Sequence, residues 1–221
     1  MELYRLAALI PAYNESETIG KVVSQVRDFC DVYVVDDYST DNTFMQAELN
    51  GAFVIRNTGD NGYESALGFG YREVAQKDYD YILTLDADGQ HNPNYIKVFF
   101  KHLSSSSDAS IIIAQRKRLP RISEKIFSQI TRRFFNIKDA FSGFKCYKVK
   151  DFLNYSFSDH HLTGLNFLNL ALVNNKEIIT FDISIEDRKD SPRFGSSFIS
   201  NLILIRSISI FFILLIMRRP N

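Results

Sequence analysis

The 221-residue chain lacks the features that mark secreted, zinc-binding and nucleic-acid-binding proteins. Its two cysteines, Cys30 and Cys146, lie far apart without metal-like spacing, which argues against a disulfide framework and a zinc site. Its 26 lysines and arginines are balanced by 26 aspartates and glutamates, so no overall positive field favours nucleic acid. The apolar run near the N-terminus is too short for a secretory signal. We therefore expect a protein of a reducing, cytosolic setting that does not bind nucleic acid.

Short apolar runs alternate with amphipathic segments of roughly ten to fifteen residues, a pattern typical of alternating strands and helices. The predicted strands are Leu6–Ile10, Val32–Asp36, Ala52–Arg56, Tyr81–Leu85 and Ser110–Ala114. The predicted helices end near Arg27, Asn50, Gln76, Leu103 and Phe135. No internal repeat is present, and Ser104–Ser107 is too short for an interdomain linker. The pattern predicts one α/β domain, with a mostly parallel sheet flanked by helices on both faces.

Two carboxylates stand directly after the predicted strand Tyr81–Leu85. They are Asp86 and Asp88, followed by the Gln90 amide, and they lie at the strand end where open α/β sheets bind ligands. Mg²⁺ is usually held by one or two carboxylates plus substrate phosphates, which this group fits. The alternative is a polar turn without a metal. Another strand ends in the pair Asp36 and Asp37, which could instead only cap the following helix.

A dense basic run, Arg116–Arg121, follows the strand that ends at the same sheet edge. Arg132 and Arg133 lie further along, within the predicted helix Ile122–Phe135. Such a run is often only a solvated face, but its place and the forked guanidinium favour phosphate binding. Two histidine sites, His91 and the pair His160–His161, are interpreted as polar surface residues rather than ligands.

The segment Phe198–Met217 is apolar over 20 residues and is followed by Arg218 and Arg219. As a helix it would be about 30 Å long, close to the thickness of a bilayer. Arg206 lies inside it, and an arginine near mid-span costs at least about 2.5 kcal/mol. We therefore predict a helix that lies on the membrane surface, with its arginines at the headgroups. The alternative is a helix packed on the core or on a partner.

Five segments, in order along residues 6–147, carry a resemblance to a known family. They are IPAYNE (10–15), VVDDYSTDNT (34–43), NTGDNGYESALGFGY (57–71), LDADGQH (85–91) and DAFSGFKCYK (139–148). The chain resembles the inverting glycosyltransferases of family 2, and among them the dolichol- or polyprenyl-phosphate hexosyl synthases. The resemblance implies a GT-A fold over residues 1–197 and a membrane-associated helix over 198–221.

The resemblance also implies roles for individual residues. The nucleotide-sugar site would contain Pro11, Ala12, Tyr13, Glu15, Asp36, Asp37, Asn61, Gly62 and Asp86, with Glu15 at the ribose and Asp36 or Asp37 at the base. Asp86, Asp88 and Gln90 would hold Mg²⁺ or Mn²⁺ at the donor diphosphate. The catalytic residues would be Asp88, Arg116 and Arg121. The acceptor side would contain Ser123, Asp139, Ser142, Gly143, Phe144, Arg188 and Arg193.

The implied reaction is metal-dependent transfer of a hexose, with inversion, from a UDP- or GDP-sugar to a polyprenyl or dolichyl phosphate at the cytoplasmic membrane face. Three departures from the family pattern concern charge. Asn61–Glu64 lacks the family's lysine, Gly164–Leu170 lacks its acidic residue, and Phe198 replaces a lysine. Two alternatives follow: transfer to a sugar hydroxyl in polysaccharide assembly, which needs a general base, or a degenerate nucleotide-sugar-binding module that regulates a membrane partner. The apolar C-terminal surface could also mediate homo-oligomerisation.

Overall fold

The computed structural model describes residues 4–106, 108–119, 121–154 and 163–185, together with 205–206, 208–209, 211–213 and 216. The strands are β1 Leu6–Ala12, β2 Asp31–Asp36, β3 Phe53–Arg56, β4 Tyr81–Thr84, β5 Ile111–Arg116, β6 Lys145–Lys148 and β7 Ile178–Ile183. The α-helices are α1 Ile19–Val26, α2 Thr43–Leu49, α3 Tyr63–Ala75, α4 Ile96–Ser105, α5 Ile122–Phe135, α6 Val149–Phe152 and α7 Thr163–Val173, with a 3-10 turn, η1, at Pro93–Tyr95. From β1 to α5 the order of elements agrees with the predicted alternation of strands and helices, whereas the elements from β6 to β7 were not predicted.

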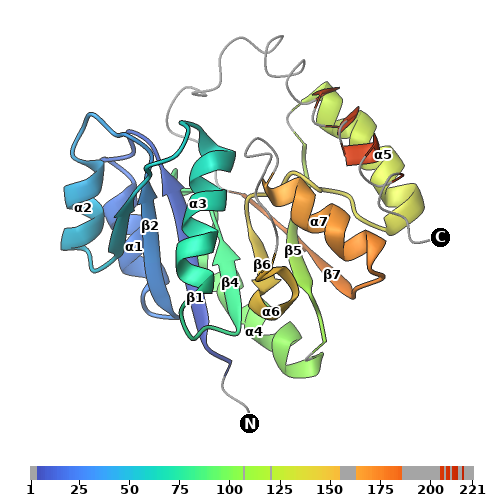
Figure 1. The fold of residues 1–221 in the computed structure, drawn as a ribbon, viewed down its shortest axis with the longest axis horizontal. Coiled ribbons are helices and arrows are strands. Elements are labelled where there is room, and N and C mark those ends of the chain that lie inside the picture. The colour runs from blue at the N-terminus through green and yellow to red at the C-terminus, as the bar shows by residue number, and fades with distance from the viewer. Residues whose placement is uncertain are drawn as a thin grey trace.

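The described strands form one sheet in the order β3-β2-β1-β4-β6-β5-β7 (Figure 1). Strand β1 pairs in parallel with β2 and β4, and β5 pairs in parallel with β7. Only β6 runs against its neighbours β4 and β5, so the predicted mostly parallel sheet is confirmed. The carboxyl ends of β1, β2, β4 and β5 therefore meet at one edge of the sheet, as the sequence predicted.

Side chains alternate between the two faces of the sheet and form two buried clusters. In β1, Ala7 and Leu9 belong to the cluster under α3, whereas Ala8 and Ile10 belong to the cluster on the opposite face. Because both faces are covered, all of β1 is buried, which explains its uninterrupted apolar run. The sheet thus holds its edge loops on a rigid support.

Several element boundaries differ from the prediction by one or two residues, and two of these differences have a clear cause. The helix expected to start at Pro93 begins with the 3-10 turn, because the Asn92 side chain accepts a hydrogen bond from the Asn94 N–H (3.0 Å) and tightens the first turn. Strand β5 continues to Arg116, two residues past its predicted end, because its pairing with β7 extends that far.

The described part of the C-terminal segment packs against the domain. Phe211 is buried, its ring meets that of Phe127 in α5 edge to face at 5.4 Å, and its carbonyl accepts a hydrogen bond from Asn169 Nδ2 (2.7 Å). Figure 1 shows the red C-terminal pieces beside α5. Within the described residues, no helix is long and apolar enough to cross a membrane. The Phe211 side of this segment is therefore packed on the core, which was the alternative to a helix on the membrane surface. The predicted boundary at residue 197 lies outside the described residues.

Candidate active site

The loops that follow β1 and β2 are joined by hydrogen bonds. The Asn14 side-chain oxygen accepts from the Thr40 N–H (2.8 Å), and the Glu15 N–H donates to Thr43 Oγ1 (2.7 Å). The Asp41 carboxylate accepts from the Ser16 N–H (3.2 Å) and from Thr43. Burial alone would raise the pKa of Asp41, but these hydrogen bonds hold it below its usual value. The IPAYNE and VVDDYSTDNT segments therefore form one preorganised wall of the site.

Asp36 and Asp37 lie side by side in sequence but serve different purposes. Asp37 accepts hydrogen bonds from Asn57 Nδ2 and from the Gly62 N–H, both at 2.8 Å, so it fixes the loop between β3 and α3. Asp36 Oδ1 is buried and has no hydrogen-bond partner within the structure. A buried acceptor without a donor is costly, so this oxygen is suited to receive an N–H group from a ligand. The reading of both residues as helix caps alone is wrong for Asp37, which holds a distant loop.

The carboxylate turn after β4 is held by its neighbours. Asp88 Oδ1 accepts a hydrogen bond from the Gln90 N–H (3.0 Å), and the Asp86 side chain is 37% exposed. His91 Nδ1 accepts from the Asp86 N–H (3.3 Å), and its ring stacks on Phe144 at 5.0 Å. The interpretation of His91 as a surface residue is wrong, because it is buried at 5% exposure where the turn folds back on the core.

Gly143 brings the segment between α5 and β6 against Asp86. A β-carbon at Gly143 would lie 2.3 Å from Asp86 Oδ1, so a larger residue there would force the Asp86 carboxylate or this loop to move. Thr84 Oγ1 donates to the Gly143 carbonyl (2.8 Å), and Ser142 Oγ donates to the Ala114 carbonyl (2.7 Å). Ser142 and Phe144, both predicted on the acceptor side, are buried and hold this loop in place.

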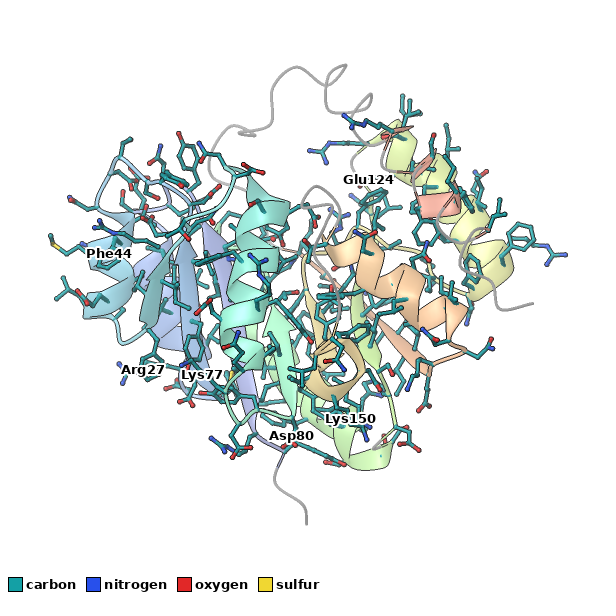
Figure 2. All side chains as sticks on the ribbon, viewed as in Figure 1. Arg27, Phe44, Lys77, Asp80, Glu124 and Lys150 are labelled. Atoms are coloured by element: carbon teal, nitrogen blue, oxygen red, sulfur yellow. The ribbon has the colours of Figure 1, made fainter. Side chains whose placement is uncertain are left out.

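Two of the predicted phosphate-binding arginines lie in a cluster with carboxylates. Arg116 donates to both oxygens of Asp139, from Nε at 2.7 Å and from Nη2 at 2.9 Å. Glu124, labelled on α5 in Figure 2, accepts from Arg116 Nη2 (3.3 Å) and from Arg121 Nη1 (3.0 Å). Burial raises the pKa of Glu124, although the two arginines oppose that shift. Burial would lower the pKa of Arg116, but Asp139 raises it, so this guanidinium stays charged.

The structure pairs Arg116 with Asp139 and links Arg116 to Arg121 through Glu124, a residue that the sequence analysis did not single out. Its signal was its position three residues after Arg121, which places the two side chains on one helical face. Because Asp139 and Glu124 already bind these guanidinium groups, a phosphate would share them rather than meet free cations. These carboxylates hold both arginines in position, and Arg116 lies close enough to Asp86 for the two charges to interact.

A cavity of about 30 Å³, with room for about one water molecule, is lined in part by Gly143. Lys145 and Glu64 line it, and both were missed as site residues by sequence reasoning. Lys145 Nζ donates to the Ala140 carbonyl (2.8 Å), and burial lowers its pKa to about 8. Glu64 Oε2 accepts from the Gly164 N–H (3.0 Å) at the start of α7, and burial raises its pKa. The signal for Glu64 was its position in the first turn of α3, at the end of the Asn61–Glu64 segment that lacks the family lysine.

The remaining predicted residues fall into three groups. Those that are buried are Pro11, Ala12, Glu15 and Ser123. Those that reach solvent are Tyr13, Asn61 and Gly62. Those that lie outside the described residues are Arg188, Arg193, His160 and His161.

In the part of the chain that the structure describes, no three His, Cys, Asp or Glu side chains are grouped as a closed metal site. The partly exposed carboxylates Asp86 and Asp88 do fit an open site for a hard divalent cation. Such a site has one or two carboxylates and leaves positions for phosphate oxygens. The donor set therefore agrees with the expected Mg²⁺ or Mn²⁺.

The chain is similar in sequence to known glycosyltransferases. Residues 7–167 match the family model described as "Glycosyl transferase family 2". The chain is 28% identical over 166 residues to the undecaprenyl-phosphate mannosyltransferase of Micrococcus luteus, covering 66% of this chain and 67% of that protein. It is 32% identical over 116 residues to the dolichol-phosphate mannosyltransferase of Pyrococcus furiosus, covering 48% of this chain but only 32% of that protein.

The fold also matches that of a solved enzyme. The crystal structure of glucosyl-3-phosphoglycerate synthase from Mycobacterium tuberculosis, in complex with Mn²⁺, UDP and glucosyl-3-phosphoglycerate, superposes with a TM-score of 0.77 at 17% identity. The match covers 99% of this chain and 81% of that chain. It confirms the GT-A fold class predicted from the sequence. With the family model matching residues 7–167, the chain belongs to glycosyl transferase family 2.

Proposed function

We propose that the protein transfers a hexose, with inversion, from a nucleotide diphosphate sugar to a polyprenyl or dolichyl phosphate at the cytoplasmic face of a membrane. The observation that carries this proposal is the contact of Asp86 with Gly143, which puts the carboxylate turn beside the Arg116–Asp139 pair. The names of the two mannosyltransferase relatives support a lipid phosphate as acceptor.

The donor nucleotide would lie on the wall formed by the loops after β1 and β2. Asp36 Oδ1, which is buried without a partner, would accept an N–H group of the base. Glu15, held by the Thr43 hydroxyl at its own N–H, would face the ribose. Because the two loops are already joined, little ordering would accompany binding of the nucleotide.

The donor diphosphate would reach the carboxylate turn. Asp86, Asp88 and Gln90 would hold a divalent cation, which, when bound, neutralises charge on the leaving diphosphate. His91 fixes the Asp86 backbone, and Gly143 limits where the Asp86 carboxylate can lie. The protein would therefore position the leaving group before the acceptor arrives.

The acceptor would approach on the side of Arg116 and Arg121. A phosphate acceptor is already an anion, so its oxygen can attack the anomeric carbon without a strong base. Asp139 and Glu124 hold the guanidinium groups in place, and the arginines would stabilise charge as the bond forms. Attack from the face opposite the diphosphate inverts the anomeric centre.

Transfer to a sugar hydroxyl is a second candidate, and one observation favours it. The acidic residue missing from the first turn of α7 is replaced in space by Glu64, whose carboxylate binds the Gly164 N–H. A carboxyl whose pKa is raised by burial is suited to act as a general base near neutral pH. A nucleotide-sugar-binding module without turnover is the third reading, motivated by the missing charged residues.

The test uses labelled UDP- and GDP-hexoses with polyprenyl phosphate, in the presence of Mn²⁺ or Mg²⁺ and then of a chelator. We expect metal-dependent label in the organic extract, and its loss in Asp88→Ala. Bound donor without labelled lipid would reject the lipid acceptor. Transfer to a sugar hydroxyl that is lost in Glu64→Gln would support the second candidate, and no turnover with any acceptor would leave the binding module.

A further inference from the structure

Helix α5 is packed on one face and exposes large apolar side chains on another. Phe127 and Thr131 face the core and are buried. Ile122, Ile126 and Phe134 are 69%, 56% and 70% exposed. Ile122 and Ile126, four residues apart, form a row on one face of the helix, whereas Phe134 is twelve residues after Ile122, about 120° further round, in the last turn. Because apolar area in water is unfavourable, such a row marks a surface that is covered in the functional state.

The C-terminal segment adds a second exposed apolar row next to this helix. Ile205, Ile213 and Ile216 are 52%, 54% and 70% exposed, and the eight- and three-residue steps between them keep them on one side of a helix. Phe211 of the same segment is buried against Phe127 of α5. The two elements are thus joined by their inner faces, and each keeps an apolar outer row.

The exposed charged side chains described on and next to α5 are of one sign. The exposed charged residues described between 117 and 135 are all basic, namely Lys117, Arg118, Lys125, Arg132 and Arg133. Arg206 is also exposed in the C-terminal segment. The whole chain has no net charge, so this is a local concentration of positive charge. Isoleucines beside arginines and lysines are the composition of a helix that lies in the interface of an anionic bilayer.

We propose that the outer face of α5, together with the exposed isoleucines of the C-terminal segment, binds the surface of a bilayer that contains anionic lipid. The polyprenyl phosphate acceptor, on which this inference rests in part, would be drawn from that bilayer. The opposite side of α5 carries Glu124, which binds Arg116 and Arg121. The helix would then lie between the membrane and the acceptor side of the site.

A second copy of the chain fits this surface less well than a membrane does. A two-fold symmetric dimer brings the same patch of each copy together, so Lys125, Arg132 and Arg133 would approach their own equivalents. Lipid phosphates instead supply the opposite charge, and each basic residue near such a surface is worth about a fivefold gain in binding.

The test is cosedimentation of the full chain with vesicles of phosphatidylcholine alone and of equal parts of phosphatidylcholine and phosphatidylglycerol. The variant Ile122→Ser with Ile126→Ser removes two exposed side chains four residues apart. Met45→Ser with Leu49→Ser is the matched control, because these residues are 56% and 73% exposed at the same spacing on α2. Figure 1 shows α2 and α5 at opposite ends of the molecule.

We expect binding to the anionic vesicles to fall about tenfold or more in the α5 pair and to stay unchanged in the α2 pair. Replacing Lys125, Arg132 and Arg133 by glutamine should remove most of the preference for phosphatidylglycerol. Equal binding by both serine pairs, or no binding by the unmodified chain, would overturn the proposal. So would a dimer that dissociates in the α5 pair while vesicle binding persists.

Two further measurements, nucleotide binding and sugar transfer to a short, water-soluble polyprenyl phosphate, test the proposed reaction without requiring membrane binding. Both should be unchanged in the α5 pair, whereas transfer to vesicle-embedded acceptor should fall. Vesicle binding without any transfer would reject the proposed reaction and leave the docking surface supported.

Discussion

Replacing Gly143 with alanine tests the closest contact in the proposed metal site. The new β-carbon would lie 2.3 Å from Asp86 Oδ1 and 2.8 Å from Asp86 Cγ, whereas a separation of 3.4 Å is ordinary contact. The carboxylate or the loop must therefore move by about 1 Å. Gly143 does not have the positive φ that disfavours alanine, so the clash, and not backbone strain, is the perturbation.

A shift of about 1 Å in a positioning group can lower a rate about 100-fold. We expect Gly143→Ala to lower kcat/KM by about that factor and to raise the Mn²⁺ concentration needed for half-maximal rate. The assay measures initial rates of sugar transfer across a range of Mn²⁺ concentrations, with Mn²⁺-dependent binding of UDP as a second readout. Urea unfolding of the same variant reports whether the fold is intact.

The matched control is Gly164→Ala, on the wall of the same cavity. Its new β-carbon would meet its nearest atoms, Lys145 Nζ and Tyr147 Oη, at 3.7 Å, which is ordinary contact. The Gly164 N–H that binds Glu64 would remain. If Gly143→Ala matched Gly164→Ala in rate and in Mn²⁺ dependence, the Asp86 carboxylate would not be the group that positions the metal.

Three further substitutions separate the roles of other residues. Asp36→Asn should weaken nucleotide binding about tenfold or more in calorimetric titration without loss of stability, because its oxygen has no protein partner; unchanged affinity would remove it from base recognition. Asp139→Asn breaks the buried pair with Arg116 and should lower the free energy of unfolding by about 3 kcal/mol in urea; a loss below about 1 kcal/mol would show that solvent screens the pair. Lys145→Met removes a side chain whose pKa is about 8 in the folded protein and 10.5 as an exposed lysine in the unfolded chain. Between these two pH values the unfolded chain binds more protons than the folded protein, so stability rises with pH. The unmodified protein should therefore gain up to about 3 kcal/mol of stability relative to the variant as pH rises from 8 to above 10. A difference in the free energy of unfolding that does not change with pH would contradict burial of the ammonium.

The parallel part of the fold was readable because its strands are buried on both faces. Strands such as Leu6–Ala12 then appear as continuous apolar runs, and helices of regular spacing separate them. Strand β6 gave no such signal, since Lys145 and Lys148 make up half of it and are nevertheless buried. Its antiparallel direction depends on pairing with β4 and β5, which are distant in sequence.

The arrangement of the candidate site was predictable where one short motif supplies neighbouring carboxylates, and not where interacting residues come from separate elements. Asp86 and Asp88 stand in one turn, so their common position followed from the sequence. The different hydrogen bonding of Asp36 and Asp37 could not be predicted in this way, because it depends on the loop that contains Asn57 and Gly62. His91 was misplaced for the same reason, since its burial is created by Phe144 from a segment far along the chain.

Glu64 shows that an acidic residue missing from one sequence motif can be supplied by another part of the fold. The first turn of α7 lacks an acidic side chain, which by sequence favours a phosphate acceptor that needs no base. Yet α3 delivers the Glu64 carboxylate to that turn, 3.0 Å from the Gly164 nitrogen, in a cavity shared with Lys145. The choice between the two acceptors therefore depends on whether this carboxylate reaches the acceptor or only fixes α7 and Lys145. A base would give Glu64→Gln a lost acidic limb in the pH profile of kcat, whereas a positioning group would lower the rate equally at every pH.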